Sequence, residues 1–161
     1  MLPVLSRIIR TAGGSQCRSF ASLTGLLQSQ SAEKENEMVK ALREAKKNQS
    51  GRNIFDSIVE KQIKVDVLYE DDHCMAFKDV NPQAPTHFLV IPKTRIQMLE
   101  QATDEHESIL GKLLLTAKRL ANERLPNGYR VVINNGPEGC QSVYYLHVHV
   151  IGGRQLTWPP G

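Results

Sequence analysis

The feature that most constrains the fold is one long amphipathic run between residues 103 and 125. Thr103 offers a helix N-cap, and Asp104 and Glu105 follow in the first turn, where the helix dipole favours acidic side chains. Apolar residues then recur at helical spacing and form one stripe: Ile109, Leu110, Leu113, Leu114, Ala117, Leu120 and Ala121. Pro126-Asn127-Gly128 ends the run. This segment predicts an amphipathic helix that has to bury its stripe against a second layer.

Short β-rich runs on both sides of this helix supply the second layer. Three precede it and two follow it, at 65–69, 74–77, 87–92, 129–134 and 144–151. The acidic turn at 70–73 joins the first two runs as a hairpin. Residues 54–59 carry apolar pairs at the spacing of a short helix. Strands, then a helix, then strands predict an α+β domain, with an antiparallel sheet of about five strands, one long helix and one short helix.

The first 32 residues have a different composition from the rest of the chain. They contain Arg7, Arg10 and Arg18 but no Asp or Glu, and they are rich in Ser and Thr. Their apolar residues fit one helical face: Leu2, Val4, Leu5, Ile8 and Ile9. This composition is typical of a mitochondrial transit peptide, so we expect the protein in the mitochondrion, in its matrix. A secretory signal is disfavoured because arginines interrupt the apolar run, whereas a tail without a targeting role stays open as an alternative.

The rest of the chain divides into a polar segment and one domain. Residues 33–52 are dominated by Glu, Lys, Gln, Asn and Ser and predict a polar helix or linker, which leaves 53–161 as the folded domain. No stretch approaches the roughly 20 apolar residues of a membrane span. The formal net charge of +3 equals the three arginines of the leader, so the remainder is neutral and does not favour nucleic acid as a partner. The three cysteines, at positions 17, 74 and 140, form no CxxC pair, which fits a reducing compartment.

Two histidines alternate along the last predicted strand. In 144–151 the residues Tyr145, His147 and His149 share one face, with the two imidazoles about 7 Å apart along the strand. Imidazoles placed in this way can act as nucleophile, proton donor or metal ligand near neutral pH. Plain packing is one alternative. Metal binding is another, with His87 or His73 as a third ligand.

A polar loop directly precedes this strand. Residues 134–142 read Asn-Asn-Gly-Pro-Glu-Gly-Cys-Gln-Ser, a turn rich in small polar groups and backbone amides. Such a loop can form a nest for phosphate oxygens, although many loops of this kind are only hairpin connections. No carboxylate or cysteine in or just after the strand completes a zinc site. Phosphate and imidazole together therefore favour transfer at phosphorus over metal chemistry.

Three longer motifs carry a resemblance to a known family. They are His147-Val-His-Val-Ile-Gly-Gly-Arg-Gln155, Trp158-Pro-Pro-Gly161 and Asp79-Val-Asn-Pro-Gln-Ala-Pro-Thr-His-Phe-Leu-Val-Ile-Pro92. Together they resemble the histidine triad family in its nucleotide-binding Hint branch, and the similarity covers residues 54–161. The resemblance implies an antiparallel sheet with helices, a homodimer, and hydrolysis of adenosine 5′-phosphoramidates such as lysyl adenylate, with no metal or other cofactor.

The same resemblance implies roles for individual residues. His147 would attack the α-phosphorus to form a nucleotidyl-histidine, which water then cleaves. His149 would bind the phosphate and, with Ser142, help to protonate the departing amine, while His87 supports the site. The expected ribose contacts are Asp79 and Val80. The expected phosphate-side contacts are Asn134, Cys140, Gln141, Ser142, His147, Val148 and His149. The expected walls of the base pocket are Ile54, Phe55, Ile58 and Phe77, which in isolation would be ordinary core residues.

Two positions depart from the family pattern. Tyr145 stands where the first histidine of the triad is usual, although its main-chain carbonyl can still orient His147. Cys140 stands where glycine is more usual. Tyr145 leaves open a second hypothesis, a nucleotide-binding protein that regulates or scaffolds without catalysis. The pair of histidines leaves open a third, a metal-dependent hydrolase. His73 and His106 lie in polar surroundings and are expected at the surface.

Overall fold

The computed structural model describes residue 39 and residues 51–159. The expected transit peptide at 1–32 and nearly all of the polar segment at 33–52 lie outside the described residues.

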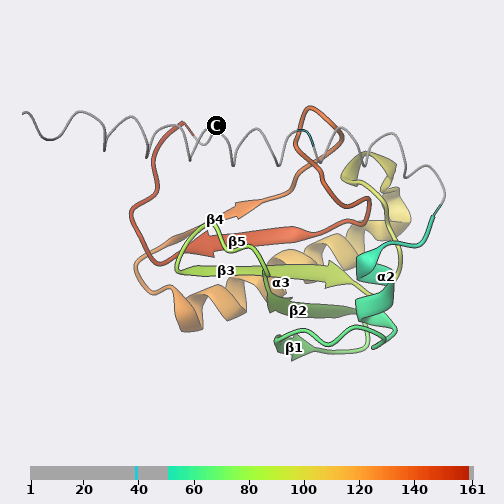
Figure 1. Ribbon diagram of the computed structural model, residues 1–161, viewed down its shortest axis with the longest axis horizontal. Coiled ribbons are helices and arrows are strands. Elements are labelled where there is room, and N and C mark those ends of the chain that lie inside the picture. The colour runs from blue at the N-terminus through green and yellow to red at the C-terminus, as the bar shows by residue number, and fades with distance from the viewer. Residues whose placement is uncertain (1–38, 40–50, 160–161) are drawn as a thin grey trace, which may run out of the picture. The chain divides into compact units, whose positions relative to one another are not determined.

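Five strands form one antiparallel sheet (Figure 1). They are β1 Val67–Glu70, β2 Cys74–Lys78, β3 Thr86–Pro92, β4 Tyr129–Val132 and β5 Val148–Gly152. Their order across the sheet is β1-β2-β3-β5-β4, so the last strand inserts between β3 and β4. This insertion pairs Leu89 with His149 and His87 with Ile151, which places histidines from two distant segments on neighbouring strands. The expected α+β fold is confirmed.

The long helix α3 spans Glu107–Arg124 and begins after a 3-10 turn at Asp104–His106. At this turn the Thr103 N–H donates to Nδ1 of His106 at 3.0 Å, which leaves His106 only half-buried rather than fully at the surface. The prediction that Leu114 belongs to the buried stripe is wrong, because its side chain is 48% exposed. Thr116 is buried in its place, and its hydroxyl lies 3.6 Å from Sγ of Cys74. A polar residue could take a core position because this contact satisfies its hydroxyl.

Apolar side chains pack on both faces of the sheet. On one face α3 covers a core from β2, β3 and β5 that includes Ala76, Phe88, Val90, Val148 and Val150. On the other face a smaller cluster forms beneath the short helix α2, Ile54–Val59, and consists of Phe55, Ile58, Met75, Phe77, Leu89, Ile91 and Tyr145. The histidines of β3 and β5 alternate with the α3-side residues and therefore share the face of α2. None of the described helices is long and apolar enough to cross a membrane.

Asn53 starts α2 and also fixes its position. The Asn53 side-chain oxygen accepts the N–H of Phe55 at 2.9 Å, and the Asp56 carboxylate accepts the N–H of Asn53 at 2.7 Å, which completes a capping box. The Asn53 amide nitrogen donates to the carbonyl of Tyr144 at 3.0 Å. The cap thus ties α2 to the segment that leads into β5.

Strand β5 is shorter than the sequence predicted. It begins at Val148, not at residue 144, because the preceding amides bond elsewhere: the Tyr145 N–H donates to Val143 and the Leu146 N–H donates to the carbonyl of Ile96. Strand β4 likewise ends at Val132, two residues earlier than expected. His147 therefore lies on a bent segment at the entrance of β5 instead of within the strand.

Candidate active site

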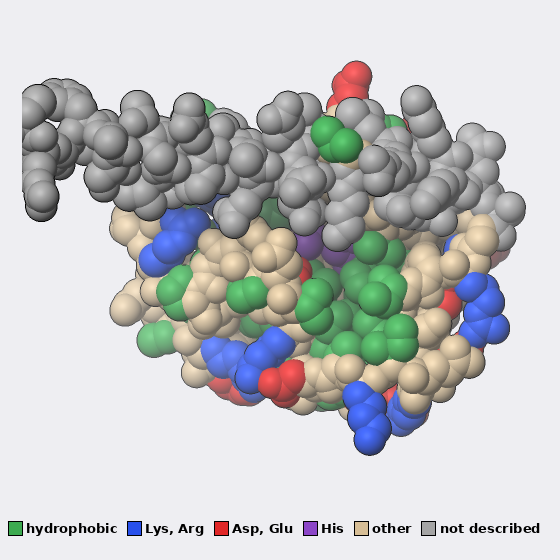
Figure 2. Space-filling view, in the orientation of Figure 1, with side chains coloured by type: hydrophobic (Ala, Val, Ile, Leu, Met, Phe, Trp, Pro, Cys, Tyr) green, Lys and Arg blue, Asp and Glu red, His purple; other side chains and the backbone are tan. Residues whose placement is uncertain are grey.

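Three imidazoles converge on the α2 side of the sheet. His147 precedes β5, His149 lies on β5 and His87 lies on β3. The ring centroids of His147 and His149 are 4.8 Å apart, closer than the strand spacing of about 7 Å that the alternating pattern suggested. Nε2 of His87 lies 2.9 Å from Nδ1 of His149. Figure 2 shows histidine side chains at the surface on this face, next to a group of hydrophobic side chains.

His147 is held as a nucleophile would need to be. Its side chain is buried, and Nδ1 lies 2.6 Å from the main-chain oxygen of Tyr145. A carbonyl can only accept, so Nδ1 carries the hydrogen and Nε2 keeps its lone pair. The ring of Phe55 packs edge-on against the imidazole with centroids 5.3 Å apart. Burial lowers the pKa of His147, so the lone pair stays available near neutral pH.

Tyr145 contributes its backbone to the site while its side chain belongs to the core. The ring is buried, and its hydroxyl donates to the carbonyl of Pro92 at 2.7 Å. Burial raises the pKa of Tyr145 to about 12, so the phenol stays neutral. The expectation that a tyrosine at this position still orients His147 through its carbonyl is confirmed.

His149 and His87 form a group with Asp79, in which His87 is buried and the other two side chains are half-buried. The Asp79 carboxylate lies 3.3 Å from Nε2 of His87 and 3.9 Å from Nδ1 of His149. Burial, together with the charges that His147 and His87 can carry, lowers the pKa of His149 to about 3. Burial also lowers the pKa of His87, against the effect of Asp79. Nε2 of His149 is buried and has no hydrogen-bond partner among the described residues. A buried polar atom is normally hydrogen-bonded, so this nitrogen is available to bind a ligand.

These same three residues are the ones whose spacing could suit a metal ion. Their ligand atoms all lie within 4.8 Å of one another. The main-chain N–H of Gln83, however, donates to Nδ1 of His87 at 3.1 Å. A neutral imidazole that binds metal through Nε2 carries its hydrogen on Nδ1 and directs it to an acceptor, whereas here Nδ1 faces a donor. The residues therefore do not fit a metal. His73, the other expected ligand, is exposed and lies outside this group.

The loop between β4 and β5 carries the expected phosphate-side residues. Cys140 is exposed at φ +58°, the left-handed region that favours the glycine usual here. The Cys140 N–H donates to Pro137, and the Gln141 N–H donates to Gly136. The predicted phosphate nest is wrong at these two residues, because their N–H groups are already hydrogen-bonded within the loop and are not available to a phosphate. The amide of Asn134 donates to the carbonyl of Cys140 at 3.4 Å, and Ser142 is half-buried on the same loop.

Gln141 braces this loop from inside. Its side chain is buried, accepts the N–H of Gly136 at 2.9 Å and donates to the carbonyls of Gln97 and Val143 at 2.8 and 3.1 Å. These bonds use the oxygen and both hydrogens of the amide, so the side chain positions the loop and is not free for a phosphate.

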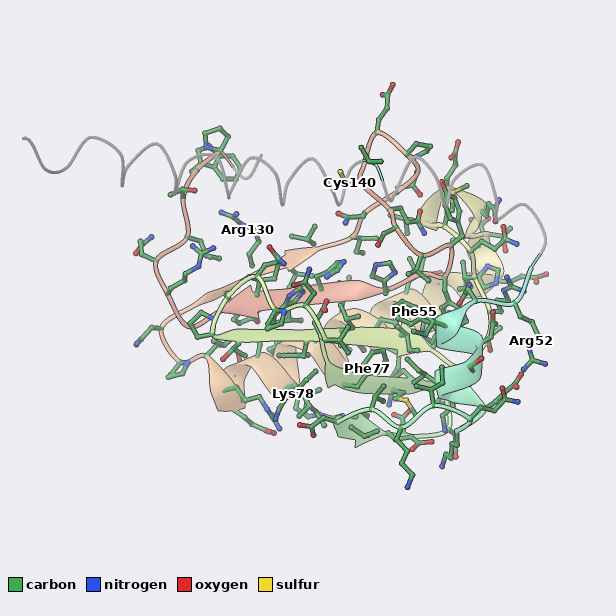
Figure 3. All side chains as sticks on the ribbon, in the orientation of Figure 1. Arg52, Phe55, Phe77, Lys78, Arg130 and Cys140 are labelled. Carbon is green, nitrogen blue, oxygen red and sulfur yellow. The ribbon has the colours of Figure 1, made fainter. Side chains whose placement is uncertain are left out.

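Most expected walls of the base pocket lie together. Phe55 on α2 and Phe77 on β2 meet edge to face with ring centroids 5.8 Å apart (Figure 3). Both are buried with Ile58, whereas Ile54 is 50% exposed and can contact a ligand directly. Val80, an expected ribose contact, is 91% exposed beside Asp79.

Val148 offers the site only its main chain. It lies between the two histidines, and its side chain packs in the α3-side core.

Some residues that support the site carried no separate signal in the sequence. Gln83 bonds His87 through its N–H, and its carbonyl accepts from the Arg154 guanidinium at 3.2 Å. Both residues fall inside the motifs that carry the resemblance, but neither composition nor spacing marks them. Asn53 could have been identified as a helix cap, since Asn three residues before Asp is a capping-box pattern.

The chain is similar to known proteins in both sequence and fold. Residues 60–156 match the HIT domain. The chain is 55% identical to adenylylsulfatase HINT1 of Arabidopsis thaliana over 111 residues, which cover 67% of this chain and 76% of that protein. It is 57% identical to a 14 kDa zinc-binding protein of Zea mays over 111 residues, covering 67% and 87%. A solved HIT family hydrolase from Legionella pneumophila Philadelphia 1 is 44% identical with a TM-score of 0.67, covering 68% of this chain and 100% of that one.

Proposed function

This chain belongs to the HIT-domain family, and from that membership and its site we propose that it hydrolyses adenosine 5′-phosphoramidates at the phosphorus–nitrogen bond. One observation carries the proposal. A buried imidazole, His147, has its Nδ1 fixed by a carbonyl, which leaves the lone pair to Nε2, and it lies next to His149, whose Nε2 has no hydrogen-bond partner in the part of the chain that the structure describes. The first group suits attack on phosphorus, and the second suits an oxygen or nitrogen of the substrate.

The reaction would proceed in two displacements. Nε2 of His147 attacks the α-phosphorus, a bond forms between these atoms, and the bond from phosphorus to the amine breaks. The amine nitrogen takes up one proton from solvent as it leaves, with His149 and Ser142 as hydrogen-bonding partners along the path of that proton. Water then attacks the nucleotidyl-histidine, releases AMP and gives up one proton, which balances the proton used in the first step.

The remaining contacts orient the nucleotide. Asp79 would bind the ribose hydroxyls, and the aromatic pair Phe55 and Phe77 would flank the base with Ile54 at the open edge. Asn134 and Ser142 would face the phosphate from the loop. Holding the phosphorus within reach of a fixed imidazole supplies much of the rate enhancement, because the reactants no longer have to find each other.

Mass spectrometry of protein quenched during turnover tests this proposal. An AMP adduct on His147 is expected, and the variant His147→Asn should lack both adduct and turnover. Binding of AMP without turnover of any phosphoramidate would instead support the non-catalytic nucleotide-binding alternative.

A second substrate class comes from a relative. The similar Arabidopsis protein carries the name adenylylsulfatase, and the same histidine could displace sulfate from adenylyl sulfate. Sulfate leaves without gaining a proton, so this reaction would depend less on His149. Comparing kcat/KM for the two substrates in wild type and His149→Asn distinguishes them.

Two further properties are part of the proposal. Location in the mitochondrial matrix is supported by the arginine-bearing, acid-free first 32 residues, and fusion of this segment to a fluorescent reporter tests it. A homodimer is supported by Leu114 and Leu115 on α3, which are 48% and 64% exposed, and by β4, whose outer edge pairs with no strand of the described sheet.

A further inference from the structure

We propose that the main-chain N–H of Gln83, acting through His87, fixes the proton of His149 on Nε2, so that the site always presents one imidazole lone pair and one imidazole N–H. This inference rests on the proposed function only for its catalytic consequence. The positions of the protons follow from the hydrogen bonds alone.

The chain of hydrogen bonds starts at the main-chain N–H of Gln83. A peptide N–H can only donate, and at 3.1 Å it donates to Nδ1 of His87. That nitrogen must therefore hold a lone pair, and in the neutral ring the hydrogen is then on Nε2. A doubly protonated His87 is disfavoured for the same reason, since two hydrogens would face each other.

The second link joins His87 to His149. The Nε2–H of His87 lies 2.9 Å from Nδ1 of His149 and 3.3 Å from the Asp79 carboxylate. Because a hydrogen already occupies the space between the rings, Nδ1 of His149 has to accept. The single hydrogen of neutral His149 is then on Nε2, the buried atom that lacks a partner among the described residues.

The consequence is a site with two opposite tautomers. His147 donates through Nδ1 to Tyr145 and offers the lone pair of Nε2, whereas His149 accepts through Nδ1 and offers the hydrogen of Nε2. An anionic phosphoryl group needs this combination, a nucleophile for phosphorus and a donor for oxygen or for the leaving nitrogen. With the reverse tautomer, His149 would present a lone pair and repel the phosphate oxygens.

Residue 83 is itself held firmly. Its carbonyl accepts from the Arg154 guanidinium at 3.2 Å, and its side-chain amide donates to the carbonyl of Asn81 at 3.0 Å. Arg154 lies just beyond β5, so the strand that carries His149 also positions the peptide that sets its tautomer. Gln83 and Arg154 are positioning residues, since they act on the substrate only through the histidines.

Two-bond nitrogen–proton correlation spectra of histidine-labelled protein test the proposal without any substrate. In the wild type His87 and His149 should show hydrogens on Nε2, and His147 on Nδ1. Gln83→Pro removes the N–H and should leave His87 and His149 as mixtures of tautomers. Gln83→Ala keeps the N–H and loses only the bond to Asn81, so it is the matched control and should match the wild type.

The outcomes separate the two proposals. A hydrogen on Nδ1 of His149 in the wild type overturns this inference even if the enzyme is active, and so do unchanged tautomers in a folded Gln83→Pro. If Gln83→Pro does not fold, the wild-type spectrum still tests the tautomers of His87 and His149. A second variant, Arg154→Ala, should broaden the His87 and His149 signals. Its control, Arg130→Ala, should leave these signals unchanged. Absence of turnover on any phosphoramidate rejects the proposed function but does not affect the inferred tautomers of His87 and His149. With turnover present, Gln83→Pro should lower kcat about ten-fold with little change in KM.

Discussion

Nδ1 of His147 lies 2.6 Å from the main-chain oxygen of Tyr145, two residues before it. The contact is local, and it uses an atom that every amino acid has. The family's first histidine could therefore be replaced by tyrosine without loss of the orientation of the nucleophile. What the replacement adds is a second anchor, because the phenol hydroxyl reaches the carbonyl of Pro92 at the end of β3.

Tyr145→Phe should separate these two contributions. Loss of the hydroxyl leaves the Pro92 carbonyl short of a donor and should lower the free energy of unfolding by about 1–3 kcal/mol. The carbonyl at position 145 is unchanged, so kcat should fall by less than about ten-fold. Denaturant unfolding and steady-state kinetics measure both effects. A loss of activity as large as that of His147→Asn would show that the phenol itself takes part in catalysis.

The pH dependence of activity should reflect the buried nucleophile. Burial lowers the pKa of His147 from its ordinary 6.5, so the ring stays neutral at pH values where an exposed histidine is protonated. The acid limb of kcat/KM should therefore have its midpoint below 6.5. Initial rates across a pH series, corrected for the uncatalysed breakdown of the phosphoramidate, give this midpoint. A midpoint at or above 6.5 would mean that the imidazole is not desolvated in the free enzyme.

Activity should be independent of metal. The N–H of Gln83 donates to Nδ1 of His87. It therefore disfavours the tautomer with hydrogen on Nδ1, which His87 would need in order to bind a metal through Nε2. Exhaustive dialysis against a chelator should leave kcat unchanged, and elemental analysis of the purified protein should find less than one zinc per chain. Stoichiometric metal together with loss of activity after chelation would support the metal-dependent alternative instead.

The exposed leucines of α3 should hold two copies together. Leu114→Glu combined with Leu115→Glu places two like charges in the proposed contact and should weaken the dimer by roughly 2 kcal/mol or more. Sedimentation equilibrium measures the change. Ile63→Glu alters an apolar residue that is 41% exposed and lies outside α3 and β4, so it serves as the control and should remain dimeric. A wild-type monomer at all concentrations would refute the proposed assembly.

Sequence patterns predicted the elements better than their connections. The five strands and both helices follow from alternation, helical spacing and turns, since those are set by neighbouring residues. The position of β5 between β3 and β4 is not local, and the contact of His149 with His87 across 62 residues depends on it. Thr116 shows the same limit in the core: its burial depends on a partner, Cys74, that helical periodicity cannot identify. The resemblance named candidate site residues, but it did not show that the Gln141 side chain braces the loop from within.

The hydrogen bond from the Asn53 side chain to the Tyr144 carbonyl sets how short a fragment can be and still keep the proposed site. Proteolysis or truncation that removes only residues before Asn53 keeps this side chain, which ties α2 to the segment that leads into β5. Removal of one residue more would free that helix, and with it the aromatic ring that rests on the nucleophile. Asn53 thus links the start of α2 to the segment that carries the proposed nucleophile.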